Sequence, residues 1–178
     1  MKMPKENLKY TISEGIALLF GILALAFTFL PAYFEQNRPD LSLFQIMLGD
    51  GRVGASPLLI FGFVLLIVGI IATLILLALI VLKKSNDIIT TVMSVLSIVC
   101  TLGGAIILSC GIFISGLDKL NSELGFTQGY WGFKIGNILV PVAALLSVIA
   151  SYPSAMIILH HKDLIDQQKR QGKVTSSK

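Results

Sequence analysis

Few residues in this sequence combine the side-chain types and the spacing that chemistry requires. His160 and His161 are adjacent, and Asp163 and Asp166 follow them. A metal shell needs three or four ligands, and we interpret this pair instead as solvated at a membrane edge. No Ser-His-Asp or Cys-His grouping and no cleft with paired carboxylates can be assembled with any specificity. We therefore expect no enzyme activity, no metal and no cofactor.

A glycine-rich segment at residues 49–54 has the formal spacing G-x-G-x-x-G, with Gly49, Gly51 and Gly54. A dinucleotide-binding fingerprint needs a strand before it and a soluble helix after it, so that the pyrophosphate meets the helix N-terminus. In this sequence a long uncharged apolar segment follows. We interpret the glycines as a flexible turn.

Cys100 and Cys110 lie in one apolar segment. Ten residues of helix separate them by about 15 Å, which is too far for a disulfide. We expect both to pack as small side chains.

The elements that must position all these residues are membrane spans. The chain has 178 residues, of which 54% are hydrophobic and 13% charged, and its mean hydropathy is +0.84. An ordinary soluble domain carries about twice as much charge, and a disordered chain is much less hydrophobic. Because about twenty apolar residues cross a bilayer as a helix, four uncharged segments qualify. They are residues 15–34, 53–82, 88–117 and 135–159.

The sequence therefore predicts an all-α fold, an integral membrane four-helix bundle. We expect one transmembrane domain over residues 1–160, with spans at about 13–34, 57–82, 88–117 and 135–159. Pro57 suits the first turn of the second span. Residues 161–178 form a basic tail that is attracted to anionic lipid headgroups and lacks the aromatic pattern of nucleic-acid binding.

The distribution of basic residues predicts the orientation. Ten of the fourteen Lys and Arg residues lie before the first span, between the second and third spans, or in the tail. The positive-inside rule then places both termini in the cytoplasm, and we expect the plasma membrane. The first span is too long for a signal peptide and is expected to be retained. This layout resembles the tetraspan arrangement of claudin-like and tetraspanin proteins, although no cysteine lies in either external loop.

Small residues mark the faces where membrane helices approach each other. They recur at helical spacing on the first, third and fourth spans, which we expect to make the close contacts, while the second exposes more of its perimeter to lipid. The predicted interface, within the bundle or between copies, consists of Gly21, Ala24, Ser94, Ser97, Thr101, Gly104, Gly111, Ser115, Gly132, Gly136, Ala143 and Ser147.

Glu14 lies in the same row of the first span as Ala17, Gly21 and Ala24. No ionisable residue falls in the middle of any span, and such residues usually mark ion paths and proton relays. Because Glu14 is about one turn inside the cytoplasmic end, we expect it at the interface near Lys9. There its charge would favour the positive end of the helix dipole.

An apolar external cap is the most unusual feature of the loops. Asp40 and Gly49 suit the start and the end of a short helix over residues 41–48. The third helix is expected to continue outward to Gly125, followed by aromatic residues typical of a membrane interface. The cap either seals the bundle or docks a partner, and its residues are Leu41, Phe44, Ile46, Met47, Leu48, Tyr130 and Trp131.

The leading functional hypothesis is a non-enzymatic accessory, assembly or regulatory subunit that contacts membrane lipids and a membrane-protein partner or further copies of itself. One alternative is a small oligomeric transporter or pore. The other is a membrane enzyme acting on lipid headgroups through external acids, namely Asp40, Asp50, Asp118 or Glu123.

Overall fold

The computed structural model describes residues 5–34, 40–49, 54–82, 87–115 and 132–152, and it contains four helices long and apolar enough to cross a membrane. Three of them are α1 (Lys5–Phe27), α3 (Pro57–Val81) and α4 (Asp87–Ser109). The fourth runs over Ile135–Tyr152 and is called the fourth span below. The predicted class, a mostly helical membrane bundle, is confirmed.

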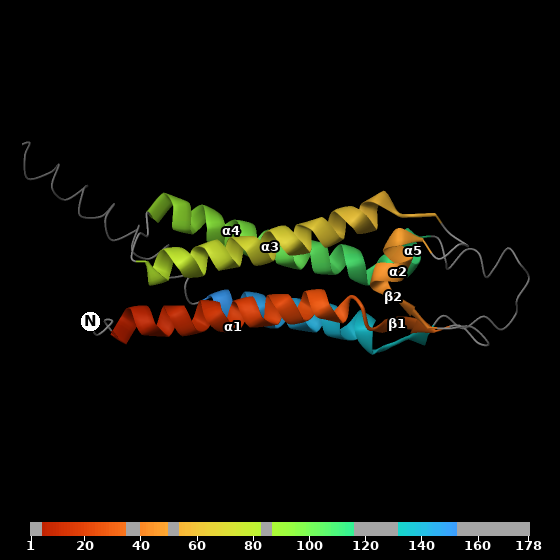
Figure 1. Ribbon diagram of the computed structural model, residues 1–178, viewed down its shortest axis with the longest axis horizontal. Coiled ribbons are helices and arrows are strands. Elements are labelled where there is room, and N and C mark those ends of the chain that lie inside the picture. Colours follow the sequence, from red (N-terminus) through yellow and green to blue (C-terminus); the bar gives the residue numbers. More distant parts are fainter. Residues whose placement is uncertain (1–4, 35–39, 50–53, 83–86, 116–131, 153–178) are drawn as a thin grey trace, which may run out of the picture.

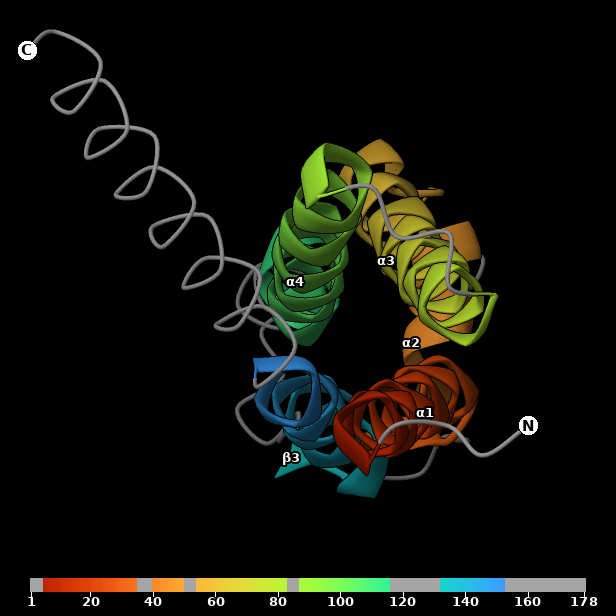
Figure 2. The same cartoon turned by 90° about the vertical axis from the view of Figure 1, so that its left-hand side faces the viewer.

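Successive long helices run antiparallel (Figure 1). α3 and α4 form one pair, and α1 and the fourth span form the other (Figure 2). α1 begins, α3 ends and α4 begins at one end of the bundle, which we call the Lys9 end. Short strands and the short helix α2 (Leu43–Leu48) lie at the opposite end, which we call the sheet end.

The first span differs from its predicted bounds at both ends. α1 begins at Lys5 and ends at Phe27, where Thr28 N donates to Leu25 O at 3.2 Å in a closing turn. Pro31 then begins strand β1 (Pro31–Phe34). Proline has no amide hydrogen and clashes with the preceding helical turn, so the apolar run up to residue 34 cannot remain helical.

The third span is interrupted where a continuous helix was predicted. α4 ends at Ser109, and α5 (Gly111–Ile114) follows with Cys110 as its N-cap. Ser109 Oγ donates to Ala105 O at 2.8 Å, a bond that competes with the helix backbone. The predicted continuation of this helix over residues 116–125 lies outside the described residues.

Three short strands form an antiparallel sheet in the order β2-β1-β3, with β2 at Leu41–Ser42 and β3 at Gly132–Phe133. Because Leu41 and Ser42 pair with β1, α2 is shorter than the predicted helix 41–48. Its N-cap is Ser42, not Asp40: Ser42 Oγ accepts from Gln45 N, and Gln45 Oε1 accepts from Ser42 N. α2 ends at Gly49, as predicted, with a φ of 90° that favours glycine.

The hydrophobic core is concentrated at the sheet end. Side chains from the strands, α2 and all four long helices meet there and are buried. They include Tyr33, Leu43, Ile46, Met47, Leu59, Leu66, Leu108 and Val140. This packing closes the bundle interior at the sheet end.

Candidate functional site

α1 and the fourth span meet along a row of small residues. Ser147 Oγ donates to Ala17 O at 2.7 Å, and a Cβ on Gly21 would lie 3.6 Å from Ser147 Oγ. Ala24 and Ala143 are buried on the same two helices. Small side chains and a hydroxyl therefore let these two backbones approach closely.

Glu14 lies in this contact and is fully buried. Ser151 Oγ, on the fourth span, is 3.0 Å from Glu14 Oε1 and 3.2 Å from Oε2. One residue earlier on each helix, Ser13 Oγ donates to Ala150 O. The carboxyl group is thus held between two membrane-spanning helices.

The expectation that Glu14 interacts with the positive end of the helix dipole is wrong, while its position at the membrane interface stays a prediction. Because α1 begins at Lys5, Glu14 is its tenth residue, well past the first turn in which the dipole acts. The sequence did contain the relevant signal. Glu14 precedes Ala17, Gly21 and Ala24 at steps of three and four, so it occupies the helix face that packs.

α3 and α4 approach each other most closely at glycines. A Cβ on Gly69 would lie 2.7 Å from Thr101 N, and one on Gly104 would lie 2.6 Å from Gly62 O. Thr73 Oγ1 and Ser97 Oγ are 2.5 Å apart. The expectation that the second span makes fewer close contacts is therefore wrong. Its glycines pack against α4, a periodicity that the surrounding Leu, Ile and Val residues obscure in the sequence.

Ser94, one turn before Ser97 on α4, is buried, and its Oγ has no hydrogen-bond partner among the described residues. An orphaned buried hydroxyl is uncommon and points to a group that completes its bonding. Thr90, Ser97 and Thr101 are also buried on this face. The interior toward the Lys9 end therefore contains more buried hydroxyl groups than the sheet end, although the apolar Leu76 is buried there too.

The other predicted interface residues lie nearer the sheet end. A Cβ on Gly136 would lie 2.7 Å from Leu30 O, and one on Gly111 would lie 3.4 Å from Leu43 Cδ2. Ser115 is half-buried just after α5, and Gly132 lies in β3. The small-residue faces thus pack elements of one chain against each other.

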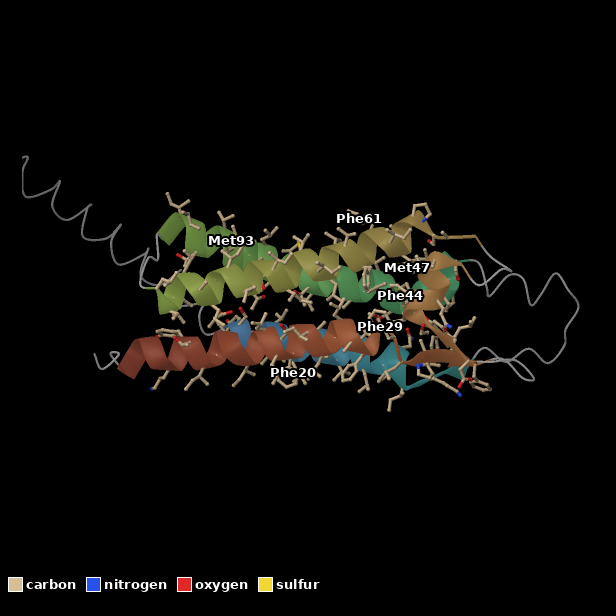
Figure 3. All side chains as sticks on the ribbon, viewed as in Figure 1. Phe20, Phe29, Phe44, Met47, Phe61 and Met93 are labelled. Atoms are coloured by element: carbon tan, nitrogen blue, oxygen red, sulfur yellow. The ribbon has the colours of Figure 1, made fainter. Side chains whose placement is uncertain are left out.

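Most of the described residues of the predicted external cap are buried or half-buried. Leu41, Ile46 and Met47 are buried, Phe44 is half-buried and Leu48 is exposed. Figure 3 shows Phe29, Phe44 and Met47 near one another at the sheet end. Tyr130 and Trp131 lie outside the described residues.

Polar contacts tie the strands to the start of the fourth span. Tyr33 is buried, and its hydroxyl lies 2.9 Å from Asn137 Oδ1 and 3.4 Å from Ser109 O. Lys134 Nζ forms a salt bridge with Asp40 Oδ2. Asp40 is thus occupied in a structural contact.

The remaining chemistry-bearing residues do not come together in the described part of the chain. Cys100 is buried and Cys110 exposed, and both thiols are free. No group of three His, Cys, Asp or Glu residues that could hold a metal occurs among the described residues. His160 and His161 lie outside them, as does Gly51.

Comparisons with protein-family models, curated proteins and solved structures found no match.

Proposed function

We propose that this chain is a non-enzymatic membrane protein that acts as an accessory, assembly or regulatory subunit of another membrane protein. The observation that carries this proposal is an aromatic row at the sheet end of the bundle, which is exposed at Phe29. The partner would bind along this row.

The aromatic row consists of Phe29, Phe44 and Phe63, from the turn after α1, from α2 and from α3. Phe44 and Phe63 are half-buried against the core. The ring centroids of Phe29 and Phe44 are 4.7 Å apart, and those of Phe44 and Phe63 are 5.7 Å apart. Phe29 is 54% exposed, as is Leu48 at the end of α2. Rigid aromatic side chains are typical anchors of protein interfaces.

We do not propose the small-residue faces as the partner-binding surface, because they pack helices of this chain against each other. Gly62, Gly69 and Gly104 pack α3 against α4, and Gly21 packs α1 against the fourth span. A partner that used those faces would have to open the bundle. A partner can bind the aromatic row without opening the bundle.

The proposed orientation follows the positive-inside rule, with the Lys9 end in the cytoplasm and the sheet end outside, in the plasma membrane. Both ends of the chain would then be cytoplasmic, and the aromatic row would lie near the outer surface. Aromatic side chains at that depth also suit contact with headgroups. The experiment must therefore separate a protein partner from lipid.

A photoreactive phenylalanine analogue at position 29 makes that separation. Leu19, which is 56% exposed on α1, is the matched lipid-facing control. We expect the probe at position 29 to give a discrete protein adduct in native membranes that co-purifies at a fixed ratio, and the probe at position 19 to give lipid adducts alone. Lipid adducts alone at both positions would overturn the proposal.

Flux measurements address the pore alternative. The buried sheet-end core predicts that vesicles containing only this chain conduct neither ions nor small solutes. Flux above that of empty vesicles would contradict the accessory role and support transport. For the enzyme alternative, Asp40 is paired with Lys134, and the other candidate acids lie outside the described residues.

A further inference from the structure

We infer that Glu14, Ser151 and Ser94 form an intramembrane binding site for one proton or one hard monovalent cation. The site is reached from the Lys9 end of the bundle. This inference goes beyond the accessory role and does not depend on it.

The first observation is the buried acid itself. Among the residues whose burial the structure describes, Glu14 is the only Asp, Glu, Lys or Arg side chain that is buried. It lies five residues beyond Lys9, or about 7 Å along the helix, and about 20 Å before Phe27. Ionisable groups at such positions are costly to place and characteristically mark ion or proton sites.

The second observation is independent and comes from α4. Ser94 is 2% exposed, and its Oγ has no hydrogen-bond partner in the described structure. A structural serine in a membrane helix would normally donate to its own backbone or to a neighbouring helix. The unpartnered oxygen is therefore free to bond to an ion or to a water molecule that accompanies it.

Helix register places these two oxygen groups at the same depth. Gly21 lies opposite Ile70 on α3, and seven residues toward the Lys9 end lead to Glu14 on α1 and to position 77 on α3. Thr73 lies opposite Ser97, so position 77 on α3 corresponds to position 93 on α4, next to Ser94. Ser151 already contacts Glu14.

The ligand class follows from the donors. Carboxylate and hydroxyl oxygens suit hard cations and protons and suit soft metals poorly. One carboxylate matches the charge of one proton or one monovalent cation. A divalent ion would bring a charge excess into an interior where uncompensated charge is expensive.

The ligand reaches the site from one end only, because the kind of buried side chain changes along the length of the bundle. Toward the sheet end, buried apolar side chains fill the core, among them Leu59, Leu66 and Val140. Toward the Lys9 end the buried side chains include the oxygen-bearing Glu14, Ser94 and Ser151, beside the apolar Leu76. An ion or proton therefore enters and leaves by the same end.

Few other titratable groups accompany the site. Those on α1 are Lys5, Glu6, Lys9 and Tyr10. The fourth span adds Tyr152 and α4 adds Asp87 and Cys100, while α3 contains none between Pro57 and Val81. Carbodiimide labelling can be localised to Glu14 by mass spectrometry, which separates its titration from that of the others.

The test uses the purified full chain and dicyclohexylcarbodiimide, an apolar reagent that modifies protonated carboxyl groups. We expect Glu14 to be labelled, with a rate that changes with pH, and position 14 of the E14Q variant to be unlabelled. Slowing by sodium or lithium, but not by choline at equal ionic strength, would assign a cation. Dependence on pH alone would assign the proton.

Ser94→Ala keeps the inference falsifiable if E14Q does not fold. Loss of a hydroxyl that contacts the ligand should change the labelling rate or its pH or sodium midpoint by roughly tenfold, the effect of one hydrogen bond to a charged group. Ser109→Ala, at the sheet end, should change neither. Absence of labelling at Glu14 over the whole pH range, or identical profiles for S94A and the parent chain, would overturn the inference.

Discussion

Replacing Gly104 with alanine should force α3 and α4 apart. The new Cβ would lie 2.6 Å from Gly62 O and 2.7 Å from Leu66 N. Both atoms belong to the backbone of α3, so no side chain can rotate away. To reach an ordinary contact of 3.4 Å, the helices must separate by roughly 0.8 Å.

Two opposing effects set the magnitude. Overpacking in a tight interface costs about 1–3 kcal/mol, while alanine gains up to about 1 kcal/mol of helix propensity over glycine. Gly103 provides the control, because a Cβ there would meet only Leu65 Cδ1, at 4.0 Å. G103A gains the same propensity without the clash, so the difference between the two variants isolates the cost of separating the helices.

Reversible unfolding by a denaturing detergent in mixed micelles, followed by circular dichroism, measures this difference. We expect G104A to be about 1–3 kcal/mol less stable than G103A. A difference below about 0.5 kcal/mol, the level of an ordinary surface substitution, would show that α3 and α4 do not meet at Gly104 and would refute the close packing of these two helices.

Three further predictions concern the sheet end and the orientation. Gly136→Ala places a Cβ 2.7 Å from Leu30 O and should cost about 1–3 kcal/mol, whereas Gly15→Ala meets nothing within 4 Å and should not destabilise in the same unfolding assay. Tyr33→Phe removes the hydroxyl beside Asn137 Oδ1 and should cost about 1 kcal/mol, while Tyr152→Phe, at a position 55% exposed, should change stability little; equal effects would contradict the buried bond. In a cysteine-free background, an impermeant maleimide applied to intact cells should label Ala55→Cys and leave Lys9→Cys unlabelled, and the reverse pattern would invert the proposed orientation.

The four spans could be predicted because they depend only on composition and length. Any helix of about twenty uncharged apolar residues can cross the bilayer, and no packing detail is needed for that inference. The end of α2 at Gly49 could also be predicted, since glycine at a helix terminus is a local signal. The strands of two to four residues were not, because segments that short carry no alternating pattern.

The surroundings of Glu14 and Ser94 could not be predicted when each helix was considered alone. Glu14 belonged to a recognised row of small residues, but its depth depended on where α1 begins, and propensity locates helix ends poorly. The orphaned hydroxyl of Ser94 arises from the relative register of α3 and α4. That register is set by Gly69 against Thr101 and by Thr73 against Ser97, which are contacts between different segments of the chain.

Infrared difference spectroscopy on the purified full chain tests the central claim, that a carboxyl group inside the bundle is held by the fourth span. Bands of Glu14 are identified by their loss in E14Q. They should shift in Ser151→Ala, which removes the hydroxyl 3.0 Å from Oε1, and stay in place in Ser109→Ala. Glu14 bands that are the same in S151A as in the parent chain would contradict the account.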